Sequence, residues 1–326
     1  MFSYLMDRFR WNFYPRIRHV SKFPTHIDLE LSSACNLNCP MCYTTTDEFK
    51  KNVDRTSMHF ELFKKVIDEC AKYKSHYSIR LSWRGEPFLN PKIFEMIEYA
   101  KKRGIKEVST LTHGGFLDPE KFEKLIDLGL DWLTISTDGV GEQYEKIRAP
   151  LNFDEHLKKI KEYKEIKKRR KTSKPIIKIQ GVWPAVEKSA DEYYNTFSPL
   201  ADQVVASPLI DYLRMDTERE YIKDFVCPVL YERLTIGSDG KAYLCYNDEM
   251  GSTVVGDIHS ETVFGIWHGN KLSKARNIHL KHMGTKELAP CKYCMYPRQT
   301  KNEKKKVNKK DVNVENYTNR PQKIGM

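Results

Sequence analysis

The residues of this chain most able to do chemistry are three closely spaced cysteines, Cys35, Cys39 and Cys42, in the run CNLNCPMC. They follow HIDLELSS, which predicts a β-strand. Pro40 and two asparagines interrupt any helix here, so we expect a loop that turns its thiols inward rather than a buried helix face. A four-iron four-sulfur cluster is normally held by four cysteines. Three local thiolates would therefore leave one iron free to bind a substrate or cofactor.

This loop resembles the signature of the radical S-adenosylmethionine (SAM) enzymes, and a second segment extends the resemblance. After the predicted strand YSIRLSW comes Arg84-Gly85-Glu86-Pro87. It is similar to the Gly-Gly-Glu-Pro segment of the family, whose backbone and carboxylate meet the methionyl amino group of SAM. Arg84 stands where the family has its first glycine.

Two later segments continue the pattern. ISTDGVGEQYEKIR resembles the motif of the fourth strand, and the resemblance implies that Ser136 contacts the ribose and Arg148 the methionyl carboxylate. The Thr-Asn-Gly that usually follows the third strand reads Thr112-His113-Gly114 here, which leaves that contact open. The residues expected to bind the cofactor are Gly85, Glu86, Pro87, Ser136, Asp138, Arg148 and Gln180.

The elements that position these motifs alternate in type from His26 to about Ala206. Strand-like runs are separated by charged amphipathic stretches, the pattern of repeated βαβ units, which predicts an α/β fold with a parallel sheet, open or barrelled. The resemblance implies a partial (β/α)6 TIM-like barrel. Ligands of such sheets gather at the carboxyl ends of the strands, so the motifs are expected to share one mouth.

Four more cysteines form a second candidate metal site: Cys227, Cys245, Cys291 and Cys294. The first two frame a predicted hairpin with a Ser-Asp-Gly turn, and the last two are a C-x-x-C pair after a predicted helix. Four thiols can also hold zinc in a closed tetrahedral site, so the residues alone leave both metals open. Cys70, by contrast, lies on the apolar face of a predicted helix and is expected to belong to the core.

The spacing C-x12-G-x4-C, followed by Gly-Asp-Ile and C-x-x-C, resembles the SPASM/twitch extension of many radical SAM cores. The resemblance implies one auxiliary 4Fe-4S cluster with four protein ligands, which accepts an electron or braces the fold. The expected organisation is an N-terminal extension (1–25), a radical SAM core (26–210), a small hairpin-plus-helix iron-sulfur subdomain (211–299) and a basic, disordered tail (300–326). The expected cofactors are two 4Fe-4S clusters and SAM.

The implied reaction begins with reductive cleavage of SAM to a 5′-deoxyadenosyl radical, which removes a hydrogen atom from the substrate. The cysteine arrangement is similar to that of 2-deoxy-scyllo-inosamine dehydrogenase-type enzymes, which implies oxidation of a hydroxyl carbon in a sugar or aminocyclitol, with the auxiliary cluster taking an electron. Candidate bases for the proton are His113, Asp211 and Tyr212. A redox-neutral epimerase or dehydratase and a peptide- or protein-modifying maturase stay open, although about 25 residues before the first strand leave little room for a leader-recognition domain.

The net charge of +11 raises the question of a polyanionic partner. Residues 301–326 carry +5 of this charge, so nucleic acid is not expected as a partner, whereas an anionic small-molecule substrate stays open. No apolar run is long enough for a signal peptide or membrane span, which favours the cytoplasm and reduced cysteines. The expected electron donor is a flavodoxin or ferredoxin. The non-enzymatic alternative is a zinc-stapled binding protein.

Overall fold

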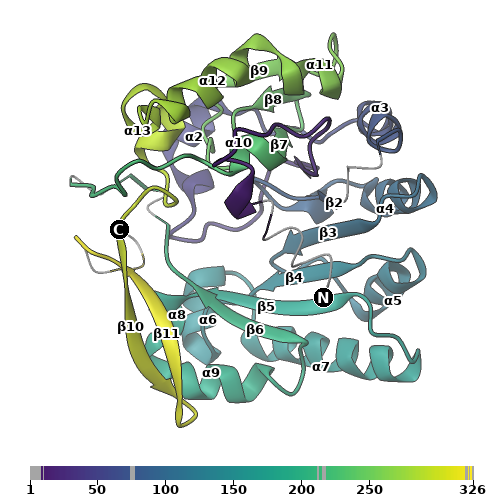
Figure 1. The fold of residues 1–326 in the computed structure, drawn as a ribbon. Helices are drawn as coiled ribbons and strands as arrows, with labels where there is room; N and C mark the ends of the chain where they lie inside the picture. The colour runs from purple at the N-terminus through teal and green to yellow at the C-terminus, as the bar shows by residue number, and fades with distance from the viewer. Residues whose placement is uncertain are drawn as a thin grey trace.

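The computed structural model describes residues 9, 11–73, 78–210, 213–214, 218–319, 322 and 324. Within these residues, nine strands form one sheet in the order β6-β5-β4-β3-β2-β1-β7-β8-β9 (Figure 1). Strands β1 to β6 pair in parallel, which confirms the predicted α/β fold with a parallel, partial-barrel sheet. These strands are β1 (His26–Leu29), β2 (Ser78–Arg80), β3 (Glu107–Thr112), β4 (Trp132–Ser136), β5 (Ile176–Val182) and β6 (Gln203–Ser207).

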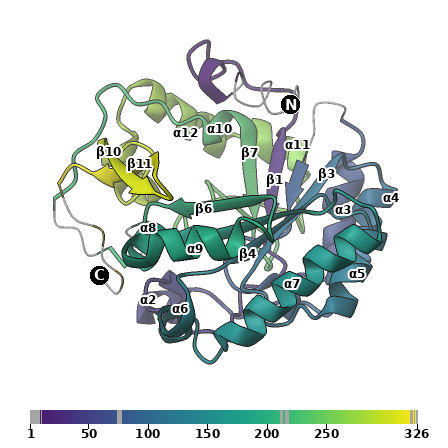
Figure 2. The same cartoon turned by 90° about the horizontal axis from the view of Figure 1, so that it is seen from below.

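Helices cover the outer face of this sheet, as the view from below shows (Figure 2). The α-helices of this part are α2 (Asp47–Asn52), α3 (Phe60–Cys70), α4 (Ile93–Lys102), α5 (Pro119–Asp127), α6 (Gly141–Arg148), α7 (Phe153–Arg169), α8 (Trp183–Val186) and α9 (Ala190–Phe197). Short 3-10 turns are η1 (Tyr43–Thr45), η2 (Pro87–Leu89) and η3 (Glu187–Ser189). Local signals set the boundaries: the Asp118 carboxylate caps α5, and Gly129, with φ +75°, follows its end.

The C-terminal part continues the same sheet. β7 (Arg233–Ile236) pairs in parallel with β1, and β8 (Lys241–Tyr243) and β9 (Val254–Asp257) follow in antiparallel pairing. The Ser-Asp-Gly turn joins β7 to β8 as predicted. The remaining helical segments are α10 (Val229–Glu232), α11 (Val263–His268), α12 (Asn270–Leu280), α13 (Gly284–Glu287) and η4 (Ala289–Lys292). Because β7 lies beside β1, the second cysteine region is held next to the first.

The prediction of a disordered tail over 300–326 was wrong for residues 300–317. There β10 (Thr300–Val307) and β11 (Lys310–Tyr317) pair as an antiparallel hairpin. The prediction rested on the mostly polar composition of the tail. The apolar side chains Val307, Val314 and Tyr317 are nevertheless buried. A tight turn with positive φ at two residues closes the hairpin.

Two further expectations concern the core and the membrane. Cys70 is buried on the inner face of α3 together with Phe63 and Ile67, as predicted. No helix among the described residues has both the length and the apolar character needed to cross a membrane.

Candidate functional site

The cysteine loop lies between β1 and η1 and gathers its three thiols. Cys39 is buried, whereas Cys35 and Cys42 are half-buried. Burial raises the pKa of Cys35 to about 11, and the nearby Glu86, Cys42 and Cys39 add to the rise. The Leu37 amide donates a hydrogen bond to Cys35 Sγ over 3.5 Å. Cys39 and Cys42 both contribute to the raised pKa of Cys35, so the three thiols lie near one another.

The Gly-Glu-Pro segment packs directly against this loop. Gly85 has φ +59°, and any Cβ there would collide with the backbone oxygens of Ser32 and Ala34. The Glu86 amide donates to the Ala34 carbonyl over 2.7 Å. Pro87 is buried and opens the short turn η2. Only glycine allows the two backbones to approach this closely, so Gly85 sets the position of the Glu86 carboxylate.

The Glu86 carboxylate is held at the end of β3. Thr112 Oγ1 donates to Glu86 Oε1 over 2.7 Å, and the His113 amide donates to Glu86 Oε2 over 3.0 Å. Burial raises the pKa of Glu86 to about 7. The Glu86 charge also contributes to the raised pKa of Cys35, so the carboxylate lies close to the thiols. A buried carboxylate at this position could accept hydrogen bonds from a positively charged group near the thiols.

His113 links the cysteine loop to Glu86. Its Nδ1 accepts a hydrogen bond from the Gly115 amide over 3.0 Å, which leaves Nε2 as the donor to Asn36 Oδ1 at 2.9 Å. Burial lowers the pKa of His113 to about 3, and Arg148 lowers it further. The ring is neutral and both nitrogens are engaged, which gives it a positioning role. Its action as a base stays a prediction, and Asp211 and Tyr212 lie outside the described residues.

Asp138 and Arg148 place a cation near the cysteine loop. Arg148 Nε donates to Asp138 Oδ2 over 2.8 Å, and the Val182 amide donates to Asp138 Oδ1 over 2.8 Å. The guanidinium opposes the rise that burial causes in the pKa of Cys39, so it lies near that thiol. The Asp138 carboxylate is used within the protein, where it aims Arg148 at the mouth.

Ser136 and Gln180 are register partners on β4 and β5 and are both half-buried. The Thr137 amide donates to the Gln180 carbonyl over 2.8 Å. Gly181 keeps this junction tight, because a Cβ there would lie 2.6 Å from the Thr137 carbonyl oxygen. Both residues lie toward the carboxyl ends of their strands, β4 and β5. The predicted cofactor-binding residues thus gather around one mouth.

His156 supports this mouth and was missed from the sequence. Its Nε2 lies 3.0 Å from Thr137 Oγ1, and its ring stacks on Tyr144 with 4.6 Å between the centroids. Burial lowers the pKa of His156 to about 3. Only its place on the inner face of the amphipathic α7 could have indicated burial.

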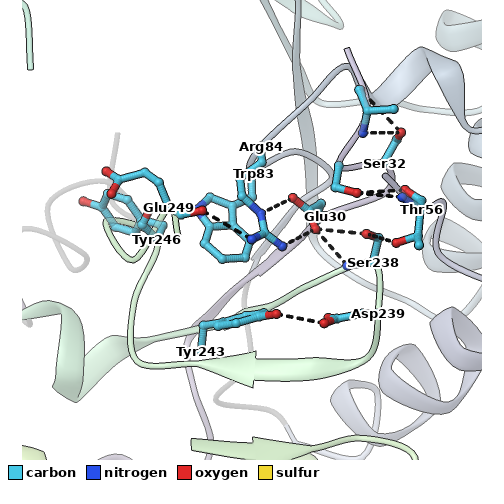
Figure 3. A network of polar contacts seen from close by, with 12 residues as sticks. Glu30, Ser32, Thr56, Trp83, Arg84, Ser238, Asp239, Tyr243, Tyr246 and Glu249 are labelled. Carbon is cyan, nitrogen blue, oxygen red and sulfur yellow. Dashed lines mark hydrogen bonds and ion pairs between the residues drawn. The ribbon is translucent and has the colours of Figure 1, made fainter. Parts of the chain in front are cut away.

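Arg84, the departure from the family pattern, connects the two halves of the chain (Figure 3). Its Nε and Nη2 donate to the two oxygens of Glu30 over 2.6 and 2.7 Å, and all these groups are buried. Ser238, in the turn between β7 and β8, donates to Glu30 through both its amide and its hydroxyl at 3.0 Å. Glu30 raises the pKa of Arg84 despite burial, which acts in the opposite direction. Arg84 therefore serves as a brace between the core and the hairpin.

The second group of cysteines comes together from three separate segments. Cys227 precedes α10, Cys245 follows β8, and Cys291 and Cys294 lie in and just after η4. All but the half-buried Cys245 are buried. Burial raises the pKa of Cys294 to about 12 and that of Cys227 to about 11, and the charges of the other thiols add to the rise in Cys245 and Cys291. All eight cysteines of the chain are described, and all are free thiols.

The residues around these thiols fit an iron-sulfur cluster. Asn247 Nδ2 donates to Cys294 Sγ over 2.9 Å, and the Tyr296 amide donates to the same sulfur over 3.4 Å. His279 Nε2 lies 3.4 Å from Cys291 Sγ. N–H groups directed at sulfur are the hydrogen bonds that tune cluster thiolates. Across the described part of the chain, no three His, Cys, Asp or Glu side chains are placed to hold a single metal ion.

Comparison with protein families decides what this arrangement is. Residues 29–181 match the model of the radical SAM superfamily, and residues 227–295 match that of the SPASM iron-sulfur cluster-binding domain. The chain contains a radical SAM domain and a SPASM domain. The two matches include both groups of cysteines and the predicted SAM contacts, from Gly85 to Gln180.

Curated relatives share the radical SAM half most clearly. A tungsten-containing aldehyde ferredoxin oxidoreductase cofactor-modifying protein of Pyrococcus furiosus is 32% identical over 113 residues, which is 35% of this chain and 30% of the relative. An AdoMet-dependent heme synthase of Methanosarcina barkeri is 29% identical over 217 residues, 66% of this chain and 58% of the relative. In both cases the match spans less than two thirds of the relative.

Solved structures share the fold of this chain over most of its length. BtrN in complex with AdoMet and 2-DOIA aligns with a TM-score of 0.59 at 17% identity, covering 83% of this chain and 92% of BtrN. Native anSMEcpe with bound AdoMet aligns with a TM-score of 0.60 at 18% identity, covering 84% and 87%. At these identities the likeness establishes the fold, not the substrate.

Proposed function

We propose that this radical SAM protein is an oxidoreductase that removes a hydrogen atom from a hydroxyl-bearing carbon of a small polar substrate, such as a sugar or aminocyclitol. The observation that carries the proposal is the pair of opposite charges beside the cysteine loop. The Glu86 carboxylate lies near Cys35 and the Arg148 guanidinium near Cys39. SAM carries an amine and a carboxylate on its methionyl end, so the two charges are complementary to it.

The roles of the residues follow from their positions. Cys35, Cys39 and Cys42 would hold the SAM-binding 4Fe-4S cluster, and the four C-terminal cysteines an auxiliary one. Once bound and reduced, the first cluster would supply the electron for the reductive cleavage of SAM. Ser136 and Gln180 line the mouth where the nucleoside would lie. The polypeptide orients the cofactor and excludes water, and the shape of the barrel interior selects the substrate.

The auxiliary site favours oxidation over a redox-neutral reaction. Four thiols would saturate a cluster and leave no iron for a substrate, so it would take up an electron or brace the fold, and the first role suits an oxidation. Trp83 Nε1 donates to the carbonyl of Tyr246, the residue after Cys245, over 2.6 Å. The ring of Trp83 also contacts Tyr243 with 5.1 Å between centroids. Packed aromatic groups thus run from the core toward the auxiliary thiols. A flavodoxin or ferredoxin would supply the reducing electron.

Anaerobic reconstitution with iron and sulfide tests the proposal. We expect about eight irons per wild-type chain and 5′-deoxyadenosine upon reduction with dithionite. Cys227→Ala should retain about four irons and still form 5′-deoxyadenosine, whereas Cys39→Ala should form none. Cys70→Ala is the matched control, because that thiol lies in the core away from both groups. A wild type that binds iron but never cleaves SAM contradicts the proposal.

With candidate sugars and aminocyclitols, stoichiometry separates the reaction types. An oxidase forms one two-electron-oxidised product for each SAM consumed, whereas an epimerase or dehydratase leaves the substrate without net oxidation. A product at the oxidation level of the substrate would therefore replace this proposal with the redox-neutral one.

A further inference from the structure

The interior of the barrel carries a lysine that the proposed SAM site does not use. Lys178 lies in the middle of β5 and points to the same side as Gln180, two residues further on. Arg80 on β2 repels it electrostatically, although β3 and β4 separate their strands in the sheet. The register of the sheet runs from Arg80 through Ser109 and Trp132 to Ile176, which lies two residues before Lys178, so Arg80 and Lys178 lie on the same face of the sheet. Lys178 and Arg80 therefore both point inward.

Lys178 is half-buried and has no hydrogen bond or ion pair to any residue that the structure describes. Its register partners in the sheet are neutral: Thr134 on β4 and Gln203 on β6. Burial lowers the pKa of Lys178, and Arg80 lowers it further. A cation held in this way lacks the counter-charge that partly buried lysines ordinarily have.

The Asp28 carboxylate on the facing strand β1 already has cationic partners. Asp28 on β1 pairs with Arg80 at 2.8 Å and lies 3.1 Å from His26 Nε2. Burial would raise the pKa of Asp28, but Arg80, His26 and Arg233 outweigh burial and hold it below its usual range. Burial lowers the pKa of His26, with a further contribution from Arg233. Asp28 thus serves the cations of β2 and β7 and leaves the charge of Lys178 unbalanced.

The position of these cations suits a substrate subsite. Lys178 lies two residues before Gln180 on its strand, about 6 to 7 Å deeper than the mouth. The Arg80 guanidinium lies 5.5 Å from the ring centroid of Tyr246, next to Cys245. Lys178 therefore lies below the predicted SAM site, and Arg80 lies beside a residue that follows an auxiliary cysteine.

We propose that Lys178 and Arg80 form a subsite inside the barrel that binds an anionic oxygen group of the substrate, a carboxylate or a phosphate ester. As a substrate subsite it rests on the proposed function, in which hydrogen is abstracted from a molecule held in the barrel. Bound there, the anion supplies the counter-charge that Lys178 lacks, and its two cationic contacts orient the neighbouring carbon toward the mouth.

Isothermal titration calorimetry on the reconstituted full chain tests the subsite, with inorganic phosphate and acetate as separate probes at low ionic strength. We expect at least one anion to bind, and Lys178→Met to weaken that binding about tenfold or more. Lys178→Arg keeps the charge and should bind within about threefold of wild type. The control Lys188→Met removes an exposed lysine and should leave binding unchanged. The probe that binds more tightly distinguishes a phosphate ester from a carboxylate.

The inference is overturned if neither anion binds the wild type, or if Lys178→Met binds as tightly as wild type. Since Lys178 has no partner to lose, its replacement should not impair folding, and a thermal melt of each variant verifies this. Formation of 5′-deoxyadenosine by the wild type is measured separately. Failure there, with anion binding intact, refutes the proposed function but not the anion site.

Discussion

The two cysteine sites differ in what surrounds their sulfur atoms. The first has three thiols, two of them half-buried, flanked by the charged groups of Glu86 and Arg148. The second has four thiols, mostly buried; the side chains that contact sulfur there are the neutral Asn247 and His279, and the nearby charged groups Asp248 and Glu249 are both acidic. Charges of both signs beside an incomplete thiol set suit a zwitterionic ligand, whereas neutral donors around a complete set suit a closed cluster. Cysteine thiols thus suit two different kinds of cluster site, depending on the residues that surround them.

The largest effect is expected at the contact between the two sites. Arg84→Met would leave the buried Glu30 carboxylate without its cation, which costs about 3–5 kcal/mol in the free energy of unfolding. Denaturant unfolding of the metal-free and reconstituted chains measures this. As control, Arg103→Met removes an exposed ion pair with Asp68 and should cost less than about 1 kcal/mol. Equal effects of the two substitutions would show that Arg84 does not brace the domains.

Loss of the Glu86 carboxylate should affect SAM binding at the first cysteine site and leave the second cysteine site unchanged. Glu86→Gln removes a charge-assisted contact to the SAM amine and should weaken SAM binding by about 10- to 100-fold, with both iron contents unchanged. Calorimetric titration with SAM measures this. Glu249→Gln is the matched control, since burial also raises the pKa of Glu249, to about 8, but Glu249 follows β8 near the auxiliary thiols. If both variants bind SAM equally well, Glu86 is not the amine acceptor.

A substitution beside the auxiliary cysteines should affect the second site alone. Asn247→Leu removes the side-chain N–H donor to Cys294 Sγ and should weaken retention of the auxiliary iron by about 10-fold. A chelator challenge followed by iron analysis measures the loss. The SAM-binding cluster and 5′-deoxyadenosine formation should persist, because the substitution lies outside the mouth. Parallel loss of both clusters would mean that the two sites are not independent.

A smaller effect is expected in acid from the buried histidine below the mouth. His156 has a pKa of about 3 when folded, below its ordinary value of 6.5, so the unfolded chain binds its proton first as the pH falls. Stability is therefore lost on acidification, by about 1 kcal/mol between about pH 6.5 and pH 5.5. His156→Gln should remove this part of the slope, and His59→Gln, at an exposed position, should not. Unfolding curves at several pH values measure the difference.

The local motifs were the predictable part of the site. The cysteine loop, the Gly-Glu-Pro segment and the hairpin turn with Gly240 are each specified by a few adjacent residues with strict backbone demands. The alternation of strand-like runs with amphipathic helical stretches likewise predicted the βα repeat. The C-terminal hairpin was not predicted, because its few apolar residues, such as Val314 and Tyr317, lie among many polar ones. Their burial depends on packing against the rest of the chain.

By itself, the sequence determined the ligand types, their spacing and the order of strands and helices, because these depend on short-range steric and hydrogen-bonding preferences. Only the tertiary structure assigned Arg84 to Glu30, 54 positions away, and placed β7 against β1. It also placed Lys178, one lysine among many in the sequence, inside a barrel without a charged partner among the described residues. Such pairings depend on long-range packing, which decides whether a charge meets water, a partner or a ligand.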